Sequence, residues 1–397
     1  MPMTSRYAVR AAALFDGVAT ATQPLVVVED GRIVSVETGG GEAPPPDAEL
    51  VDLPGATLLP GLVDTHVHLG FDAGLDPVAT LAAREPAEVL EQMAAAGAAQ
   101  LRAGVTTVRD LGDRDYLTLE LRERDLPLPT IVAAGPPITS PGGHCHFLGG
   151  VTSGVDGVRA AVREHAERGV DVIKVMASGG QMTPGTSWDA TQFPPEVLAA
   201  LVDEAHRHGL PVTAHAHAVT AIHDAVAAGV DGIEHCTFMT ADGCRPDDGL
   251  MAQLVARRIA IGLTVGMEPV PGLAPPPELL RHMPDILAMV ARICASGALV
   301  VAGTDAGIAP IKPHGVLPRG LLHLVELGLT PLQALTAGTS VAATVCGLGE
   351  RKGRVAPGYD ADLLAVAGDP LADPAVLLSP LHVMAAGRPV TLPAPAA

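Results

Sequence analysis

Short apolar runs alternate with amphipathic stretches through the middle of the chain. Runs rich in Val, Ile, Leu and Ala predict β-strands at 58–68, 104–111, 130–139, 170–178, 211–217, 230–236, 260–266 and 299–305. Helical patterns fall between them. The clearest predicted helix covers 194–209, where Pro stands at the start, Gly209 follows the end, and apolar residues recur at helical spacing.

The two ends of the chain have a different pattern. Residues 1–57 and 349–397 hold short β-like runs broken by Gly, Pro and Asp, including the loop-like piece GGGEAPPPDA. We therefore expect the ends to pair into one small β-sandwich domain, with its N-terminal part at 1–57 and its C-terminal part at 349–397. The domain between them would cover 58–348.

Eight strand–helix alternations over this length predict an α/β fold, a TIM (β/α)8 barrel whose functional residues lie at the C-terminal ends of the strands. An open doubly wound sheet is the alternative. It would not bring side chains from so many strands to one point.

Composition and charge narrow the classes of function. A hydrophobic content of 48% with 17% charged residues is typical of a globular protein. The net charge of -19 argues against a nucleic-acid partner, which requires a basic face. We expect no membrane association, because neither a signal peptide nor a bilayer-spanning run is found. Five scattered cysteines without a CxxC pair predict free thiols and a cytoplasmic location. A homo-oligomer is possible.

Polar side chains stand at the ends of five predicted strands. His66 and His68 share a face, because side chains alternate along a strand, and neutral imidazoles suit zinc. Four later predicted strands also carry polar side chains that could bind a metal. These are Lys174, His215 with His217, His235, and Asp305. Each alone could be a core or capping residue, but together they predict a metal site.

The chain resembles the amidohydrolase superfamily over almost its full length. The resemblance rests on PGLVDTHVHL, GVTTVRDLG, PGGHCHFLGG, VIKVMASGG, DEAHRHGLPVTAHAH, GVDGIEHC and GTDAG, and on GRVAPGYDADLLAVAGDPL near the end. The combination is similar to the imidazolonepropionase-like and prolidase-like branch, which includes Xaa-Pro and Xaa-Lys/Arg dipeptidases and ochratoxinase-type amidases.

This resemblance implies a binuclear metal-dependent hydrolase. It implies that His66, His68 and Asp305 bind one ion and that His215 and His235 bind the second. Lys174, carboxylated by CO2, would bridge two divalent ions, Zn2+ or alternatively Mn2+ or Co2+. A bridging hydroxide would attack the amide of a dipeptide or N-acyl amino acid, with Asp305 transferring the proton.

The remaining candidates concern the substrate. His217 shares a face with His215, so either could be the ligand; the resemblance favours His215 and implies a place near the substrate carbonyl for His217. We expect His144, Arg109 and His314 to bind the substrate, while Arg109 could instead pair with Asp110.

Three alternatives stay open. A mononuclear deaminase or imidazolonepropionase is disfavoured, because those enzymes usually carry a Glu where this chain has Ala218 and because Lys174 is present. A lactone hydrolase is not distinguished from an amidase by these residues. A non-catalytic metal-binding scaffold on a retained barrel should have lost ligands, and none is missing.

Overall fold

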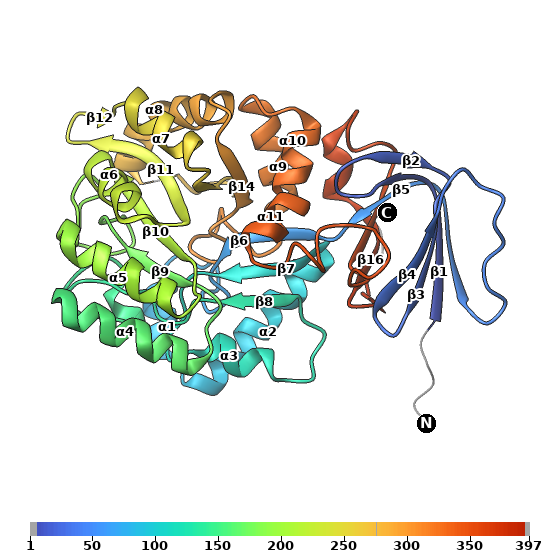
Figure 1. Cartoon of the computed structure of the whole chain (residues 1–397), viewed down its shortest axis with the longest axis horizontal. Coiled ribbons are helices and arrows are strands. Elements are labelled where there is room, and N and C mark those ends of the chain that lie inside the picture. Colours follow the sequence, from blue (N-terminus) through green and yellow to red (C-terminus); the bar gives the residue numbers. More distant parts are fainter. Residues whose placement is uncertain (1–5, 275, 394–397) are drawn as a thin grey trace.

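Eight parallel strands form the centre of the molecule (Figure 1). The computed structural model describes residues 6–274 and 276–393. The strands are β6 (Leu62–Val67), β7 (Val105–Asp110), β8 (Thr130–Ala133), β9 (Ile173–Met176), β10 (Val212–Ala218), β11 (Gly232–Thr240), β13 (Ala260–Thr264) and β14 (Leu299–Gly303). They fall at the eight predicted positions, and the α/β class is confirmed.

The pairings of these strands form a closed circuit. One sheet has the order β6-β7-β8, and a second has the order β14-β13-β11-β10-β9, with the short β12 (Gly243–Cys244) antiparallel to β11. Two isolated parallel bridges join the sheets, Ile138 with Val175 and Val67 with Ala306. The C-terminal ends of all eight strands therefore lie on one side of the circuit.

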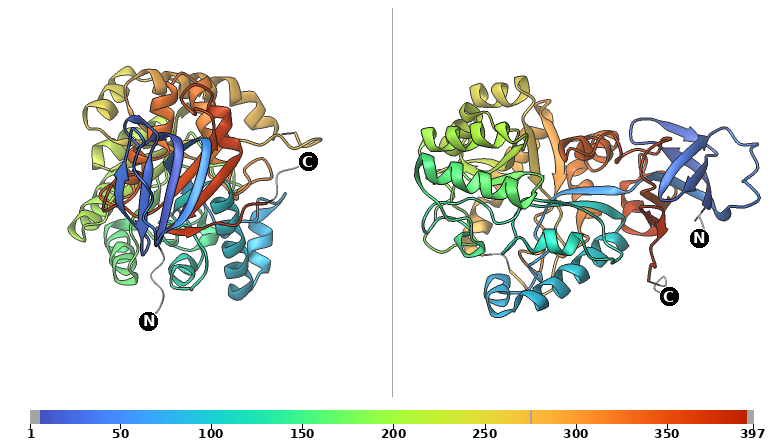
Figure 2. Two further views of the ribbon diagram at one scale, coloured as in Figure 1. Left: turned by 90° about the vertical axis from the view of Figure 1, so that its right-hand side faces the viewer. Right: turned by 60° about the horizontal axis from the view of Figure 1, so that its bottom comes forward.

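Helices surround the strands on the outside (Figures 1 and 2). They are α1 (Pro77–Ala83), α2 (Pro86–Arg102), α3 (Leu117–Arg122), α4 (Gly154–Arg168), α5 (Pro195–Arg207), α6 (Val219–Ala228), α7 (Asp248–Ala256), α8 (Pro277–Ala295), α9 (Leu317–Glu326), α10 (Pro331–Ala337) and α11 (Ser340–Val345), with 3-10 turns η1 (His146–Leu148) and η2 (Pro374–Leu378). Helix α5 confirms the clearest helix prediction. Its predicted apolar stripe, from Val197 to Ala205, is buried.

Strands from both chain ends join in one small sheet beside the central strands (Figure 1). Its order is β17-β16-β15-β5-β1-β3-β4, with β2 paired to β1. The strands are β1 (Arg6–Phe15), β2 (Thr20–Thr22), β3 (Leu25–Glu29), β4 (Arg32–Glu37), β5 (Glu49–Pro60), β15 (Leu363–Ala367), β16 (Pro380–Ala385) and β17 (Arg388–Pro389). The antiparallel pairing of β5 with β15 is where the two ends meet.

The predicted strand at 58–68 is two strands. Strand β5 of the small sheet ends at Pro60, and β6 of the central circuit begins at Leu62. Gly61 between them packs against Thr106: a Cβ at this glycine would lie 2.2 Å from the threonine Oγ1, so a side chain does not fit. One continuous apolar run thus serves both sheets.

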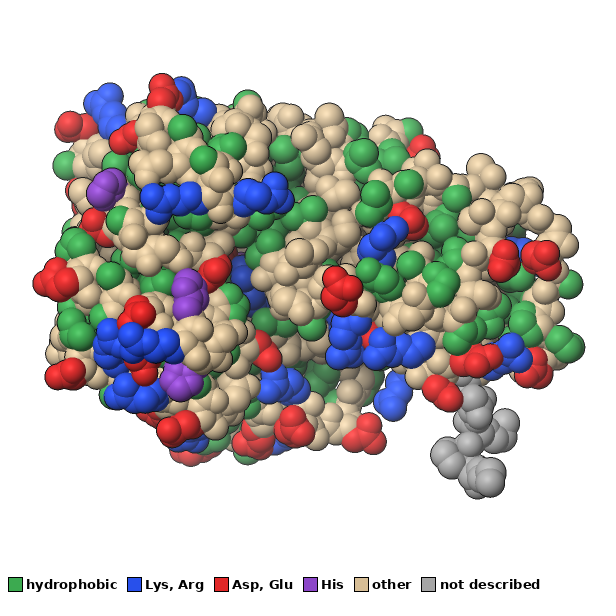
Figure 3. Space-filling view, in the orientation of Figure 1, with side chains coloured by type: hydrophobic (Ala, Val, Ile, Leu, Met, Phe, Trp, Pro, Cys, Tyr) green, Lys and Arg blue, Asp and Glu red, His purple; other side chains and the backbone are tan. Residues whose placement is uncertain are grey.

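All five cysteines are free thiols, as predicted. The helices of this part of the chain include none long and apolar enough to cross a membrane. On the face drawn in Figure 3, acidic and basic side chains are mixed.

Candidate metal centre

The first cluster consists of His66, His68 and Asp305. The imidazole Nε2 atoms of His66 and His68 lie 3.4 and 3.2 Å from the Asp305 Oδ1. One ligand atom from each residue can be chosen so that all lie within 4.8 Å of one another. These side chains meet because β6 and the segment after β14 are neighbours in the strand circuit: the Asp305 N–H donates to the His66 carbonyl at 2.7 Å.

Hydrogen bonds fix which nitrogen of each histidine faces the aspartate. His66 donates from Nδ1 to the Glu234 Oε2 at 3.0 Å, and His68 donates from Nδ1 to the Gly112 carbonyl at 3.0 Å. Neither oxygen can donate in return, so each Nδ1 carries a proton, and in the neutral ring the Nε2 presents a lone pair. Two imidazole lone pairs and a carboxylate aimed at one point are a suitable ligand set for a divalent ion.

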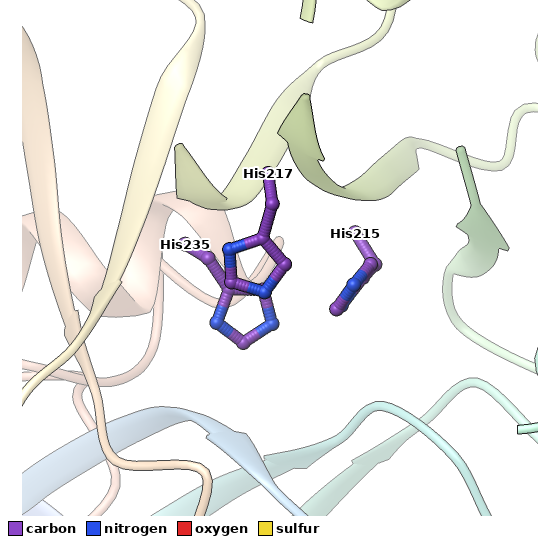
Figure 4. A group of neighbouring side chains, drawn as sticks. All are labelled: His215, His217 and His235. Carbon is purple, nitrogen blue, oxygen red and sulfur yellow. The ribbon is translucent and has the colours of Figure 1, made fainter. Parts of the chain in front are cut away.

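The second cluster consists of His215, His217 and His235. Figure 4 shows the His217 ring stacked over that of His235, with His215 beside them. The stacked ring centroids are 4.6 Å apart, and His215 lies 4.8 Å from His217 and 4.5 Å from His235. Potential ligand atoms of the three residues again lie within 4.8 Å of one another. As predicted, His215 and His217 of β10 face the same way.

The second cluster holds neutral imidazoles. Burial lowers the pKa of His217 to about 4 and that of His215 and His235 well below the usual value. Each ring also has one nitrogen engaged: His215 Nε2 with the Gly179 carbonyl at 3.1 Å, His217 Nδ1 with the Thr237 hydroxyl at 2.9 Å, and His235 Nδ1 with the Thr264 hydroxyl at 3.0 Å. Neutral histidine is the form that binds metals.

Lys174 lies close to both clusters. It is buried on β9, opposite Thr213 in the register with β10, and within the described residues its Nζ has no hydrogen-bond partner. Burial lowers the pKa of this amine to about 8. Its charge also acts on His66, His215 and His235, lowering the pKa of each. A buried amine without a partner is costly unless the site completes it.

Two of the candidate ligands have an unusual backbone. His235 has φ of 69° and Asp305 has φ of 61°, the left-handed region that non-glycine residues rarely adopt. At His235 this conformation breaks the alternation along β11, so that Glu234 and His235 both reach the interior. Backbone strain of this kind is concentrated at functional sites.

The electrostatics of the first cluster favour an ionised aspartate. Burial alone would raise the pKa of Asp305, but the charge of His66 and the hydrogen bond and charge of His68 hold it well below the usual value. Burial lowers the pKa of His66 to about 4. For His68, the hydrogen bond and charge of Asp305 outweigh burial and raise the pKa.

Two of the predicted substrate-binding residues, His144 and His314, have a ring nitrogen without a described partner. His144 lies in the site, with its ring centroid 4.6 Å from that of His215 and its Nδ1 without a partner among the described residues. His314 donates from Nε2 to the Phe71 carbonyl at 2.8 Å and leaves Nδ1 without a described partner. Both histidines therefore have a buried ring nitrogen that no described residue satisfies.

Arg109 has a structural position. Its Nη2 donates to the Glu234 Oε1 at 2.9 Å, and its Nε donates to the Thr65 carbonyl at 2.7 Å. The ion pair is with Glu234 and not with Asp110, the partner considered from the sequence. Because the guanidinium is buried and engaged in this way, the structure offers no support for the predicted substrate contact.

Sequence reasoning missed Glu234 and Trp188. Glu234 is fully buried beside His66, and the available signal was an ionisable residue within the apolar run GVDGIEHC. Trp188, the only tryptophan of the chain, packs edge-on against His217 with centroids 6.0 Å apart. It lies in the loop after β9, which no periodic pattern marks. Asp64 has a structural position, because its carboxylate accepts from the Thr304 N–H and hydroxyl.

The chain is similar to known proteins over most of its length. The model of the amidohydrolase family matches residues 57–390. Ochratoxinase of Aspergillus niger is 29% identical over 367 residues, which cover 83% of this chain and 75% of that protein. An imidazolonepropionase of Deinococcus deserti is 26% identical over 380 residues, covering 86% of this chain and 84% of that protein.

Solved structures give the same result. The structure of a Xaa-Pro dipeptidase with methionine bound in its active site superimposes with a TM-score of 0.86 at 27% identity, covering 97% of this chain and 99% of that one. The crystal structure of A. niger ochratoxinase gives a TM-score of 0.83 at 26% identity, with 98% and 96% covered. The predicted resemblance is confirmed: this chain belongs to the amidohydrolase family and is a hydrolase of carbon–nitrogen bonds of the amide type.

Proposed function

We propose that this protein is a binuclear metal-dependent amidohydrolase that cleaves the amide bond of a dipeptide or an N-acyl amino acid. One observation carries the proposal: two separate clusters of ligand atoms lie near one buried lysine whose amine has no described partner. A mononuclear site would explain only one cluster.

We also propose that the closed circuit of eight parallel strands is a (β/α)8 barrel and that the small sheet folds into a β-sandwich. A buried apolar cluster between β1, β3, β5 and β15 supports the second interpretation. In a barrel of this kind the site lies at the C-terminal ends of the strands. That arrangement agrees with the positions of His68 and Asp305, which stand just after the last residues of β6 and β14.

The residues fit two divalent ions. His66, His68 and Asp305 would hold one; His215 and His235 would hold the second, with His217 beside them. Lys174 fits as the bridge after its neutral amine adds to CO2, forming a carbamate and releasing one proton. The carbamate would replace a cation that is costly here by an anion with two oxygens. Divalent ions in such a site polarise a carbonyl and lower the pKa of water.

Asp305 is suited to transfer the proton. Its carboxylate is ionised and only 13% exposed, so it can accept a proton from the attacking water and deliver it to the leaving amine nitrogen. Its Oδ1 is already held between the Nε2 atoms of His66 and His68.

The remaining site residues would bind and orient the substrate. The backbone N–H of His217 donates to the Ser178 hydroxyl at 2.9 Å, and its ring is held by Thr237, so the Nε2 can face a substrate carbonyl oxygen. His144 and His314 would use their free Nδ1 atoms for polar groups of the substrate. The Xaa-Pro dipeptidase and ochratoxinase similarities support an amide or peptide substrate.

A metal assay and a substrate screen test the proposal together. Protein purified without chelator would be assayed for divalent ions and then screened against Xaa-Pro, Xaa-Lys/Arg and N-acyl amino acid libraries with Zn2+, Mn2+ or Co2+ and bicarbonate. We expect about two ions per chain and release of amino acid from at least one library. Fewer than one ion per chain, with no recovery on adding metal, would favour a scaffold.

Adding lactones and aminated heterocycles to the screen separates the alternatives. Inactivity on all three libraries together with lactone hydrolysis would overturn the amide proposal while leaving the metal site intact. Release of ammonia from aminated heterocycles by a one-ion protein would favour the deaminase type.

A further inference from the structure

Three hydrogen-bond donors from three different strands converge on the carboxylate of Glu234. His66 Nδ1 lies 3.0 Å from Oε2, while Arg109 Nη2 and Thr213 Oγ1 lie 2.9 and 2.7 Å from Oε1. The Glu234 side chain is fully buried.

Only an ionised carboxylate satisfies this arrangement. Both of its oxygens accept, so it can receive all three donors at once. A glutamine of the same shape has one accepting oxygen. If its amide nitrogen faced His66, the Nδ1 would have to accept and the proton would move to Nε2, the atom that faces Asp305. If its nitrogen faced Arg109 and Thr213 instead, it would meet two donors in a buried site, so the first orientation is the favoured one.

The surroundings fix the carboxylate in place. Gly262 on β13 leaves the space for it, since a Cβ at that glycine would lie 2.1 Å from the Glu234 Oε2. Arg109 is in turn anchored by the Thr65 carbonyl, next to His66 in the chain. The network therefore connects β13, β11, β10, β7 and β6 at one point behind the first cluster.

We propose that Glu234 is a positioning residue of the metal centre. It holds His66 as the Nδ1–H tautomer, so that Nε2 presents its lone pair to the ion shared with His68 and Asp305, and Arg109 orients the carboxylate that does this. This inference rests on the proposed metal site. It assigns a role to two residues that do not themselves contact the ion or the substrate. Partners that orient a metal-binding histidine typically contribute 10–100-fold to metal affinity.

The test compares Glu234→Gln with a matched control, Glu204→Gln. Glu204 is also a buried carboxylate paired with arginines, accepting from Arg159 and Arg163 at 2.8 and 3.0 Å, but it lies on α5 away from both clusters. Co2+ titrations followed by visible absorption report affinity and ligand geometry. Spectra of protein labelled with 15N-histidine report the His66 tautomer without metal.

We expect Glu234→Gln to lower Co2+ affinity by about 10–100-fold and to alter the Co2+ spectrum. In the metal-free protein His66 should change from the Nδ1–H to the Nε2–H tautomer. Glu204→Gln should change neither readout, even if it unfolds at a lower temperature. An unchanged His66 tautomer in Glu234→Gln would overturn the inference, as would equal losses of affinity in the two variants.

A second variant covers the case in which Glu234→Gln does not fold. Gly262→Ala keeps the negative charge but displaces the Oε2 from His66, so we expect it to weaken Co2+ binding in the same way. Unchanged Co2+ affinity in Gly262→Ala would contradict the positional argument. If wild-type protein bound no Co2+ while the tautomer still changed in Glu234→Gln, the proposed function would fail, but the hydrogen-bond assignment would stand.

Discussion

Replacing Lys174 by methionine removes a buried amine and keeps a side chain of similar length. The Nζ of this lysine has no described hydrogen-bond partner, and burial lowers its pKa from 10.5 to about 8. Protonation is thus harder in the folded protein than in the unfolded chain. We expect Lys174→Met to stabilise the metal-free protein, although it should destroy the binuclear site.

The magnitude follows from the two pKa values. A group whose pKa is depressed by folding destabilises the fold below that pKa, and the penalty disappears above the unfolded value. With values of about 8 and 10.5, the penalty is about 3 kcal/mol at pH 7 and about 1.4 kcal/mol at pH 9.5. The gain from Lys174→Met should therefore fall by roughly half between these pH values.

Denaturant unfolding of chelator-treated protein in CO2-free buffer measures this difference. Wild type and Lys174→Met would be compared at pH 7 and pH 9.5, and again after adding Zn2+ and bicarbonate. Ions that bind only the folded protein stabilise it, by ~2.7 kcal/mol at a free concentration of 100 times Kd. With metal we expect wild type to be more stable than Lys174→Met, because the variant lacks the bridging ligand.

Two results would refute this reasoning. If metal-free Lys174→Met were no more stable than wild type at pH 7, burying the protonated Lys174 amine would carry no cost in the folded protein. If the variant bound two ions and kept the hydrolytic rate, the bridging carbamate would be wrong even though the stability argument held.

Three further predictions concern groups outside the metal ligands. Burial raises the pKa of Asp113 to about 8, so the folded protein binds a proton that the unfolded chain releases above about pH 4. The free energy of unfolding should therefore decline by up to ~1.4 kcal/mol per pH unit as the pH rises from about 4 to 8. Denaturant unfolding of Asp113→Asn should show a flatter dependence on pH. The Nζ of buried Lys352 lies 2.6 Å from the Asp362 Oδ2 and 3.0 Å from the Asp360 Oδ2. Because Lys352→Met leaves these carboxylates without their partner, it should lower the free energy of unfolding by ~3–5 kcal/mol. Denaturant unfolding that shows a loss below ~1 kcal/mol would contradict the buried pairing. Trp188, packed against the second cluster, should lose fluorescence as Co2+ binds, in step with metal uptake; unchanged emission at saturation would place the ion elsewhere.

The candidate ligands could be predicted because strand geometry is simple. His66 with His68, and His215 with His217, are two residues apart, and alternation along a strand places each pair on one face. The closed circuit of pairings then brings the strand ends together. Position at a strand end, not any single residue, made the prediction possible.

Alternation also explains what was missed. On a regular strand Glu234 and His235 would face opposite sides, so recognising His235 as a ligand argued against Glu234. The left-handed backbone at His235 brings both side chains inward. A sequence pattern does not reveal such a conformation at a non-glycine residue. The partner of Arg109 was missed for the same reason, because that partner is Glu234.

The small sheet could be predicted only in part. Similar β-like runs at both ends indicated that the ends pair, and β5 with β15 does so. The predicted boundary between 57 and 58 falls inside β5, because this strand continues to Pro60. A run of apolar residues has no mark where one sheet ends and the next begins, apart from Gly61.

The junction between β6 and the segment after β14 links metal binding to closure of the strand circuit within the chain. Here the backbone joins the two central sheets through an isolated bridge between Val67 and Ala306. His66 and His68 stand on one side of this seam and Asp305 on the other. An ion held by these three side chains would therefore act as a cross-link between sheets, as a disulfide does between chain segments. We expect metal capture and closure of the strand circuit to be thermodynamically linked, so that amide protons along the seam exchange faster with solvent once the ion is removed.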